Sequence, residues 1–443
     1  MSDVNSADLA ARPTPEPGSD VGTAVVHCRS CGASGLRPVL DLGRTPIANA
    51  LVDPATSTAA DPTYPLNIVF CESCSLVQLG YELPAEAIFD EEYPYFSSFS
   101  DALCQHAAEH VAALIASRHL GADAFVVEVA SNDGYLLRNF VAAGIPTLGI
   151  DPSAGPAAAA ERIGVPTIVG FFGVQAAREI VAEHGRADVI VANNVMAHVP
   201  DLNDFVGGFA ELLADDGVLT VENPYVRDMV EHVEFDTIYH EHYCYYSCSS
   251  VDALMRRHGL HLNDVEYFPK LHGGTLRWSI GRTDDRSERC AAMLADERVR
   301  GMDALSYYAM FAERVGQCQH ALRQLLTRLS NSGRTVAAYG AAAKGATLLN
   351  STGIDASLVA YVVDRNTFKQ GKLMPGCRLP ILPVEVLLES PPDDVLLLAW
   401  NFADEIIAQQ AAYLDQGGTF HVPVPMPRTV VREDSGGTAG HRG

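Results

Sequence analysis

The chain has 443 residues, of which 48% are apolar and 19% charged, and its formal net charge is −24. The apolar content suffices for hydrophobic cores and excludes a wholly disordered chain, and the length suits about three domains. A strongly acidic protein repels phosphate backbones, so we expect no nucleic-acid partner. A single nucleotide remains compatible with this charge, because one diphosphate needs only a local pocket of backbone N–H groups.

The sequence lacks the signals of membrane insertion and secretion. No apolar run reaches the ~18–20 residues of a transmembrane helix, and the N-terminus has neither the basic nor the apolar segment of a secretion signal. We therefore expect a soluble, cytoplasmic protein with no membrane partner. Ten cysteines in that compartment favour metal ligands or buried apolar residues over disulfides.

The N-terminal part predicts a leader and a zinc-binding domain. Residues 1–24 are rich in Ala, Pro, Ser and Asp and predict a disordered leader. Residues 25–90 carry short strand-like segments, and a domain of this size usually needs disulfides or a structural metal ion to be stable. Two Cys-x-x-Cys pairs supply four thiolates for a tetrahedral Zn²⁺ with no open position for catalysis; they are Cys28, Cys31, Cys71 and Cys74. The alternative is two unrelated cysteine pairs.

Residues 91–285 predict a parallel, doubly wound sheet. Expected strands alternate with helical segments and cover 124–129, 146–150, 188–192, 217–221 and 274–280. The first strand runs into a turn with a single glycine, so it lacks the GxG cradle that the diphosphate of NAD requires. This pattern instead suits S-adenosylmethionine (SAM), with the turn facing the methionine part.

The predicted SAM-binding residues lie at the ends of three strands. Asp151 ends the second strand and is expected to accept hydrogen bonds from the ribose hydroxyls; a helix cap is the alternative for this residue alone. The full predicted set is Glu128, Ala130, Ser131, Asn132, Gly134, Asp151, Asn193 and Asn194.

The C-terminal part predicts a second α/β unit. Residues 286–331 lack proline and predict one or two long linking helices. Strands at 335–339, 359–363, 394–399 and 419–422 then belong to a domain over 332–428, and 429–443 predicts a disordered tail. The fold class is α/β: a Rossmann-like SAM domain, a small zinc-binding N-terminal domain and a C-terminal Rossmann-like domain.

A loop between a strand and a helix in this second unit suits a diphosphate. Gly340 and Gly345 flank small residues, a helix N-terminus favours an anion, and Lys344 adds a positive charge. Asp364 ends the next strand, where nucleotide-binding folds place a ribose contact. A vestigial NAD site and a purely structural turn are the alternatives.

Several motifs occur together in one order. They are the two Cys-x-x-Cys pairs, EVASNDGYLL at 128–137, ENPY at 222–225, YHEHYCYYS at 239–247, HGGTLR at 272–277 and AYGAAAKG at 338–345. Over residues 25–425 this set resembles the SAM-dependent sugar C-methyltransferases of deoxysugar biosynthesis in bacterial natural products. It is most similar to the C-3 methyltransferases of dTDP-4-keto-6-deoxy sugars, 3-amino sugars included. The resemblance implies a monomer whose nucleotide sugar lies between the last two domains.

The resemblance also implies the chemistry. Methylation of carbon by SAM needs an enolate, hence a base, an oxyanion stabiliser and positioning. His242 is the expected base, because an imidazole titrates near ~6.5. Glu241 would hold an imidazole or contact the substrate, and Tyr239 would stabilise the enolate or fix the sugar. An aromatic packing loop, or a metal held by His240 and His242, are the alternatives for this segment.

Three further residues complete the expected site. The resemblance implies that His198 is an accessory acid or base and that Tyr93 contacts the substrate from a segment that closes over the cavity. Arg277 would serve the sugar or pair with a carboxylate. Methylation at C-5, a non-catalytic nucleotide-sugar-binding protein and an NAD oxidoreductase are the rival functions.

Overall fold

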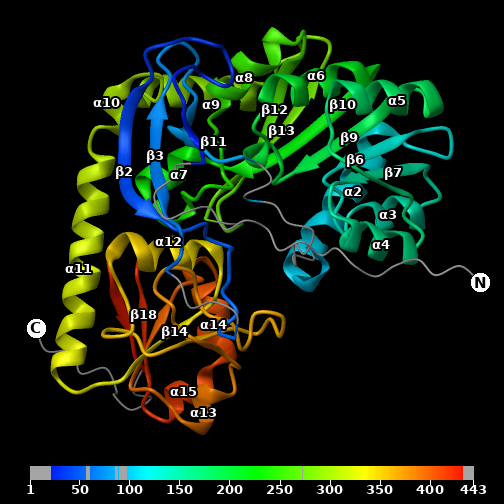
Figure 1. The fold of residues 1–443 in the computed structure, drawn as a ribbon. Helices are drawn as coiled ribbons and strands as arrows, with labels where there is room; N and C mark the ends of the chain where they lie inside the picture. The colour runs from blue at the N-terminus through cyan, green and yellow to red at the C-terminus, as the bar shows by residue number, and fades with distance from the viewer. Residues whose placement is uncertain (1–20, 56–59, 85–87, 89–96, 272, 433–443) are drawn as a thin grey trace, which may run out of the picture.

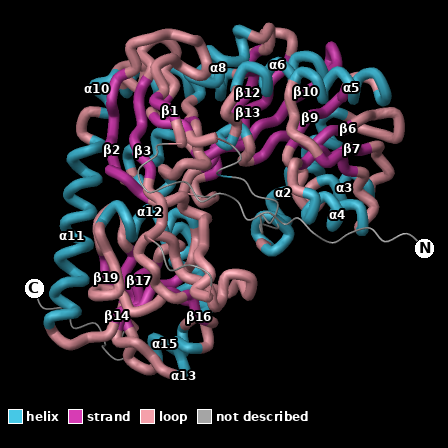
Figure 2. Tube along the Cα trace, in the orientation of Figure 1, coloured by secondary structure: helices cyan, strands magenta, loops and turns pink. Residues whose placement is uncertain are grey.

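The computed structural model describes residues 21–55, 60–84, 88, 97–271 and 273–432. Sheets of four, seven and six strands and a separate two-stranded pair make up the fold (Figures 1 and 2). Most of the predicted leader and tail lies outside the described residues. Among the helices of the described ranges, none combines the length and apolarity needed to cross a membrane.

The N-terminal lobe is an antiparallel sheet that takes one strand from the middle of the chain. Its order is β11-β4-β3-β2, and its strands are β2 Arg37–Thr45, β3 Tyr64–Phe70, β4 Val77–Leu79 and β11 Cys244–Tyr245. Along β3, buried and partly buried residues alternate, as in a strand with one face on a core. Because β11 directly follows residues 239–242, the sheet anchors that segment.

Two short strands extend beyond the predicted domain boundaries. β1 Thr23–Ala24, inside the predicted leader, pairs with β5 Tyr81–Glu82. β19 Arg428–Val430 runs past the predicted domain end at 428 and pairs with β18 Thr419–Val422. Strands of two or three residues are too short for a readable alternation, so the sequence pattern does not reveal them.

The middle lobe is a seven-stranded mixed sheet. Its order is β12-β13-β10-β9-β6-β7-β8, with β6 Val126–Val129, β7 Thr147–Asp151, β8 Thr167–Val169, β9 Ala187–Asn193, β10 Leu213–Pro224, β12 His261–Phe268 and β13 Thr275–Gly281. The expected all-parallel sheet is corrected here, because β13 is antiparallel to both β10 and β12. The connection from β12 to β13 is too short for a crossover and permits only an antiparallel hairpin.

Helices cover both faces of this sheet. They are α2 Asp101–Arg118, α3 Leu137–Ala142, α4 Ala154–Arg162, α5 Val174–His184, α6 Leu202–Leu212, α7 Val226–Glu231 and α8 Cys248–Arg257, with 3-10 turns η1 Ser97–Phe99, η2 Met196–His198 and η3 Phe235–Thr237. Helices α2, α3 and α4 pack with Val126 in one apolar cluster, and α5 and α6 pack with Val127 in another. Consecutive strand residues face opposite sides, so the two clusters lie on opposite faces.

The linking helices lead to the C-terminal lobe. They are α9 Glu288–Arg300, the short α10 Leu305–Tyr308 and α11 Phe311–Asn331, which runs along one side of the molecule between the lobes (Figure 1). The C-terminal sheet has the order β16-β15-β14-β17-β18-β19, with β14 Val336–Tyr339, β15 Val362–Val363, β16 Ile381–Leu382 and β17 Asp394–Leu397. All its strand pairs are parallel except β18 with β19.

The three lobes meet at one place. The helices of the C-terminal lobe are α12 Ala343–Thr352, α13 Val386–Glu389, α14 Ala403–Gln409 and α15 Ala411–Asp415, with the 3-10 turn η4 Trp400–Phe402. Helix α12 packs against both η3 of the middle lobe and β2 of the N-terminal lobe. Since η3 immediately precedes residues 239–242, this junction positions the expected catalytic segment.

Candidate active site

Two equivalent turns bring four cysteines together. Their sulfur atoms lie within 4.8 Å of one another, and no other His, Cys, Asp or Glu group of this kind occurs in the described part of the chain. In each turn the first cysteine accepts an N–H bond from a residue with positive φ, namely Gly32 to Cys28 and Ser75 to Cys71. Four thiolates at this separation fit the tetrahedral ligand set of Zn²⁺. The same finding leaves the alternative metal site at His240 and His242 without support.

The turn after β6 has the strained backbone of a ligand-binding loop. Ala130, Asn132 and Gly134 have φ of 58°, 50° and 77°. A non-glycine residue in this region is uncommon and is often kept for function. Asp151 at the end of β7 stabilises the turn, because its Oδ2 accepts a 2.9 Å bond from the Asn132 N–H. The loop therefore has a fixed shape before any ligand binds.

Carboxylates concentrate under this loop. Glu128 and Asp151 are buried, and burial raises the pKa of both carboxyls, with nearby Asp133 adding to the shift. One oxygen each of Glu128, Asp133 and Asn193 and the Ser131 hydroxyl are buried without a hydrogen-bond partner in the described structure. A cationic ligand with hydroxyl and ammonium donors would satisfy these acceptors, so the residues present fit SAM. Asn194, the last predicted residue, also has positive φ, at 54°.

The segment 239–242 forms a hydrogen-bonded dyad. His242 Nδ1 lies 2.8 Å from the Thr237 carbonyl, which can only accept, so Nδ1 carries the proton. Nε2 of a neutral ring is then the acceptor, and the Tyr239 hydroxyl donates to it at 2.7 Å. His198 lies alongside, with its ring centroid 4.7 Å from that of His242, and burial lowers the pKa of His198 to about 4. A neutral His198 ring therefore lies beside a His242 ring whose Nδ1 carries a proton.

Glu241 connects all three lobes. Both its oxygens accept from Asn49 Nδ2 of the N-terminal lobe, at 2.8 and 2.7 Å. Burial raises the pKa of Glu241 to about 7, while Asn49 and the positive charge of Lys369 act in the opposite direction. Lys369 belongs to the C-terminal lobe. His240, in contrast, donates from Nε2 to the Pro65 carbonyl at 3.2 Å and faces the N-terminal sheet.

The loop after β14 is shaped by its own fold. A Cβ on Gly340 or Gly345 would lie 2.9–3.0 Å from Ala399 or Leu398, so both glycines allow close packing on the end of β17. Asp364 takes the Ala341 N–H at 2.6 Å, and Lys369 Nζ donates to the Ala341 carbonyl at 2.8 Å. The Ala341 N–H of this loop is therefore already bonded to the protein itself and not available to a diphosphate.

The Lys344 side chain is partly buried at the junction with the middle lobe, and its Nζ atom is fully buried. Its Nζ lies 4.7 Å from the centroid of the Trp400 ring and has no hydrogen-bond partner among the described residues. Trp400 donates to Asp236 of η3 at 2.6 Å. Burial raises the pKa of Asp236 to about 6, opposed by Lys344 and Trp400. A positive charge without a hydrogen-bonded anion fits the expectation of an anionic ligand here.

Arg277 pairs with a carboxylate, which is one of the two roles expected for it. It pairs with the buried Glu222 at 2.5 Å, and His106 of α2 bonds the same carboxylate at 3.0 Å. Glycines such as the two in the HGGTLR motif can allow a ligand to approach the backbone closely. A Cβ on Gly273 or Gly274 would instead collide with a carboxylate of the protein itself. Tyr93 lies outside the described residues.

Four residues of the junction between the lobes were not identified from sequence patterns. Asn49 and Lys369 lie in irregular loops, and Asp236 and Trp400 carry no motif. The one available signal was weak: Lys369 stands five residues after Asp364, in the loop that follows a strand end.

Comparison with known proteins assigns the three lobes. Family models match residues 28–89 ("Putative zinc binding domain"), 104–265 (methyltransferase domain) and 270–425 (C-methyltransferase C-terminal domain). The chain is 34% identical to the C-methyltransferase NovU of Streptomyces niveus over 94% of this chain and 99% of NovU.

The solved structures that match this chain are less similar to it in sequence and cover less of its length. The magnesium protoporphyrin IX methyltransferase of Synechocystis PCC 6803 with bound SAM is 15% identical, covers 41% of this chain and 79% of its own, and has a TM-score of 0.32. A Burkholderia thailandensis 1,6-didemethyltoxoflavin-N1-methyltransferase is 18% identical, covers 42% of this chain and 81% of its own, and has a TM-score of 0.31.

The family matches and the cysteine cluster define a SAM-dependent methyltransferase with a zinc-binding domain. The match to NovU covers almost the whole of both chains, and this coverage decides which family of methyltransferases the chain belongs to. The chain belongs to the C-methyltransferase family that includes NovU.

Proposed function

We propose that the protein methylates C-3 of a dTDP-4-keto-6-deoxy sugar. A keto group acidifies the hydrogen on the neighbouring carbon, so a base can convert the sugar to an enolate. The enolate carbon attacks the methyl group of SAM, the methyl–sulfur bond breaks, and its electron pair stays on the sulfur of S-adenosylhomocysteine. The chain's own residues supply the base, the binding groups and the exclusion of water.

The orientation of His242 carries this proposal. The bond from Nδ1 to Thr237 fixes the tautomer and leaves a lone pair on Nε2. In the free protein this lone pair accepts from Tyr239. The Tyr239 hydroxyl would turn to the sugar when substrate enters, which frees Nε2 to take the C-3 proton. His198, neutral and adjacent, would relay or hold a proton in the same cavity.

The C-terminal lobe supports a nucleotide sugar as substrate. Lys344, with Gly340 and Gly345, would receive the diphosphate, because its charge is buried and not bonded to an anion. Asp364 would contact the nucleoside ribose with the lone pairs that the Ala341 and Asn366 N–H groups leave open. Glu241 would bind the sugar, since its hydrogen bonds go to Asn49 and no imidazole shares them.

The test uses deuterium exchange and methyl transfer together. Purified protein is incubated in D₂O with a panel of dTDP-4-keto-6-deoxy sugars, with and without SAM, and the products are examined by NMR and mass. We expect exchange at C-3 without SAM and one added methyl at C-3 with SAM. A methyl at C-5 would contradict the regiochemistry, and SAM binding with neither exchange nor transfer would contradict the function.

A matched pair of variants tests the base. In His242→Asn the amide can keep the bond to Thr237 while the Nε2 position is lost, so exchange should fall by roughly 10²–10⁴-fold. In His240→Gln the amide can keep the bond to Pro65, and exchange should stay within about twofold. Retained exchange in His242→Asn would rule out this base.

A further inference from the structure

Asn223 is a buried amide that the fold leaves unused. It follows Glu222 in β10, and none of its residue surface is exposed to solvent. Neither its Nδ2 nor its Oδ1 has a hydrogen-bond partner among the described residues. Burying an amide without partners disfavours folding, so such groups are rare unless they serve a ligand. The expected site residues did not include it.

The amide lines the same cavity as the proposed base. One hollow next to the dyad is bordered by a few polar side chains in an otherwise apolar wall; its lining includes Asn223, Thr237, His242, Tyr245, Ala197 and Met229. Of the polar groups that line this hollow, the Thr237 carbonyl is used by His242 and Glu234 is a carboxylate. The Asn223 amide and the Tyr245 hydroxyl are its unpartnered side-chain donors among the described residues.

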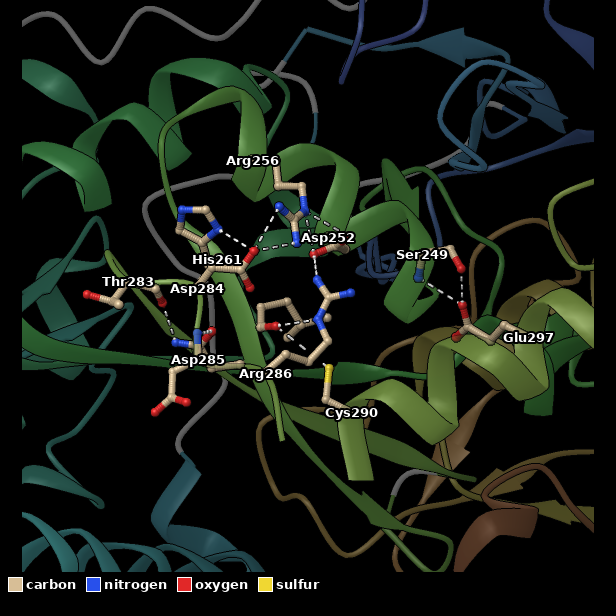
Figure 3. Close-up of polar contacts among 12 residues, drawn as sticks. Ser249, Asp252, Arg256, His261, Thr283, Asp284, Asp285, Arg286, Cys290 and Glu297 are labelled. Atoms are coloured by element: carbon tan, nitrogen blue, oxygen red, sulfur yellow. Dashed lines mark hydrogen bonds and ion pairs between the residues drawn. The ribbon is translucent and has the colours of Figure 1, made fainter. Parts of the chain in front are cut away.

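Asn223 is also held rigidly. Its backbone pairs with Leu276 of β13, and the next residue is Pro224, which restricts φ. The Tyr225 N–H donates to the Gly274 carbonyl at 2.9 Å, and the Tyr225 hydroxyl donates to Glu297 at 2.8 Å. Glu297 lies in α9 and is itself held by the start of α8, because its carboxylate accepts from the Ser249 N–H and hydroxyl (Figure 3). A donor on such a support needs no rearrangement during the reaction.

We propose that Asn223 binds the reacting keto sugar, with Nδ2 donating to the keto oxygen and Oδ1 accepting from the hydroxyl or amine on the neighbouring carbon. This inference rests on the proposed function. A carboxamide presents one donor and one acceptor side by side, which matches a carbonyl next to a hydroxyl or amine. When His242 removes the proton, negative charge moves to the keto oxygen and strengthens the Nδ2 bond. Asn223 is thus a catalytic residue that stabilises the enolate.

This assignment changes the role of Tyr239. In the free protein its hydroxyl is committed to His242, and that bond must break before Nε2 can act as the base. Asn223 has no such prior partner. The donor to the enolate oxygen is therefore Asn223 rather than Tyr239. The Asn223 carboxamide, unlike the single hydroxyl of Tyr245, presents a donor and an acceptor on separate atoms. Tyr239 keeps the base oriented and covered until the sugar arrives.

Two variants of Asn223 and one control test the inference. Asn223→Leu removes both polar atoms at similar volume, and exchange at C-3 and kcat should each fall by roughly 10²–10³-fold while SAM affinity is unchanged. Its thermal midpoint should equal or exceed that of the natural protein, because an unpartnered amide is replaced by an apolar group. Thr220→Val is the control: its hydroxyl is also buried without a partner on β10, but on the opposite face, and kcat should change less than twofold.

Asn223→Asp keeps the shape and separates a structural role from a chemical one. A protonated Asp can donate to the keto oxygen, whereas an ionised Asp repels the enolate. Exchange by this variant should therefore fall as pH rises through the pKa of the new carboxyl. Natural protein that exchanges C-3 while both variants match its rate at every pH would overturn the role of Asn223. Natural protein that exchanges no sugar would overturn the proposed function itself.

Discussion

Replacing Glu241 with Gln should stabilise the protein and impair it. Glu241 is 1% exposed, and burial raises the pKa of its carboxyl from 4.5 to about 7. A pKa that is higher in the folded state means that the folded protein binds a proton which the unfolded chain has lost. Stability is therefore lost as pH rises from about 4.5 to about 7 and stays low above that. Gln carries no charge at any pH, so Glu241→Gln escapes this loss.

The magnitude follows from the same shift. Ionised Glu241 costs about 3 kcal/mol above pH 7, and almost nothing well below pH 4.5, where the carboxyl is protonated in both the folded and the unfolded state. Glu241→Gln should exceed the natural protein in unfolding free energy by up to about 3 kcal/mol at pH 8 and by little at pH 5. Loss of a charge-assisted bond to the sugar should lower kcat/KM by roughly 10–100-fold.

Urea unfolding at pH 5 and pH 8, followed by tryptophan fluorescence, measures the difference. Trp278 and Trp400 report on the middle and C-terminal lobes. Glu297→Gln is the matched control, because this carboxylate is equally buried but accepts four hydrogen bonds, from Tyr225, Cys248 and twice from Ser249. One amide oxygen cannot accept all four, so this variant should lose about 1–3 kcal/mol at both pH values. A loss of stability for Glu241→Gln at pH 8 would refute the reasoning.

Three further perturbations test other parts of the molecule. Cys71→Ser removes one of four thiolates, and should lose Zn²⁺ and several kcal/mol of stability in metal analysis and thermal unfolding; unchanged metal content would exclude the four-cysteine site. Gly149→Ala places a methyl group against Ser131, and should weaken SAM binding at least about tenfold by calorimetry with the circular dichroism spectrum intact. Trp400→Phe removes the donor to Asp236, raises the pKa of that carboxyl further above about 6, and should steepen the fall in thermal stability between pH 6 and 8. An unchanged pH slope would show that Asp236 does not titrate there.

Local chemistry was predictable from the sequence, and contacts between distant loops were not. The Cys-x-x-Cys turns and the loop after β6 are short segments whose residue types dictate their backbone, so their place in the fold follows from spacing alone. Asn49 lies 192 residues from Glu241, and its loop has no pattern that names its partner. Asn223 was visible in the ENPY motif, but only burial without partners distinguishes it from a packing residue.

The position of Asn49 explains why a methyltransferase carries a zinc-binding lobe that is closed to chemistry. Four thiolates leave Zn²⁺ no open position, so the metal can act only through the fold. The sheet that begins beside the cysteines takes in β11, which follows the proposed catalytic residues 239–242, and the loop after β2 brings Asn49 onto Glu241. Lys369 acts on the same carboxylate from the C-terminal lobe. Asn49 and Lys369 thus act on the pKa of Glu241 from two different lobes. We expect that removal of zinc displaces Asn49 and lowers methyl transfer even where SAM still binds.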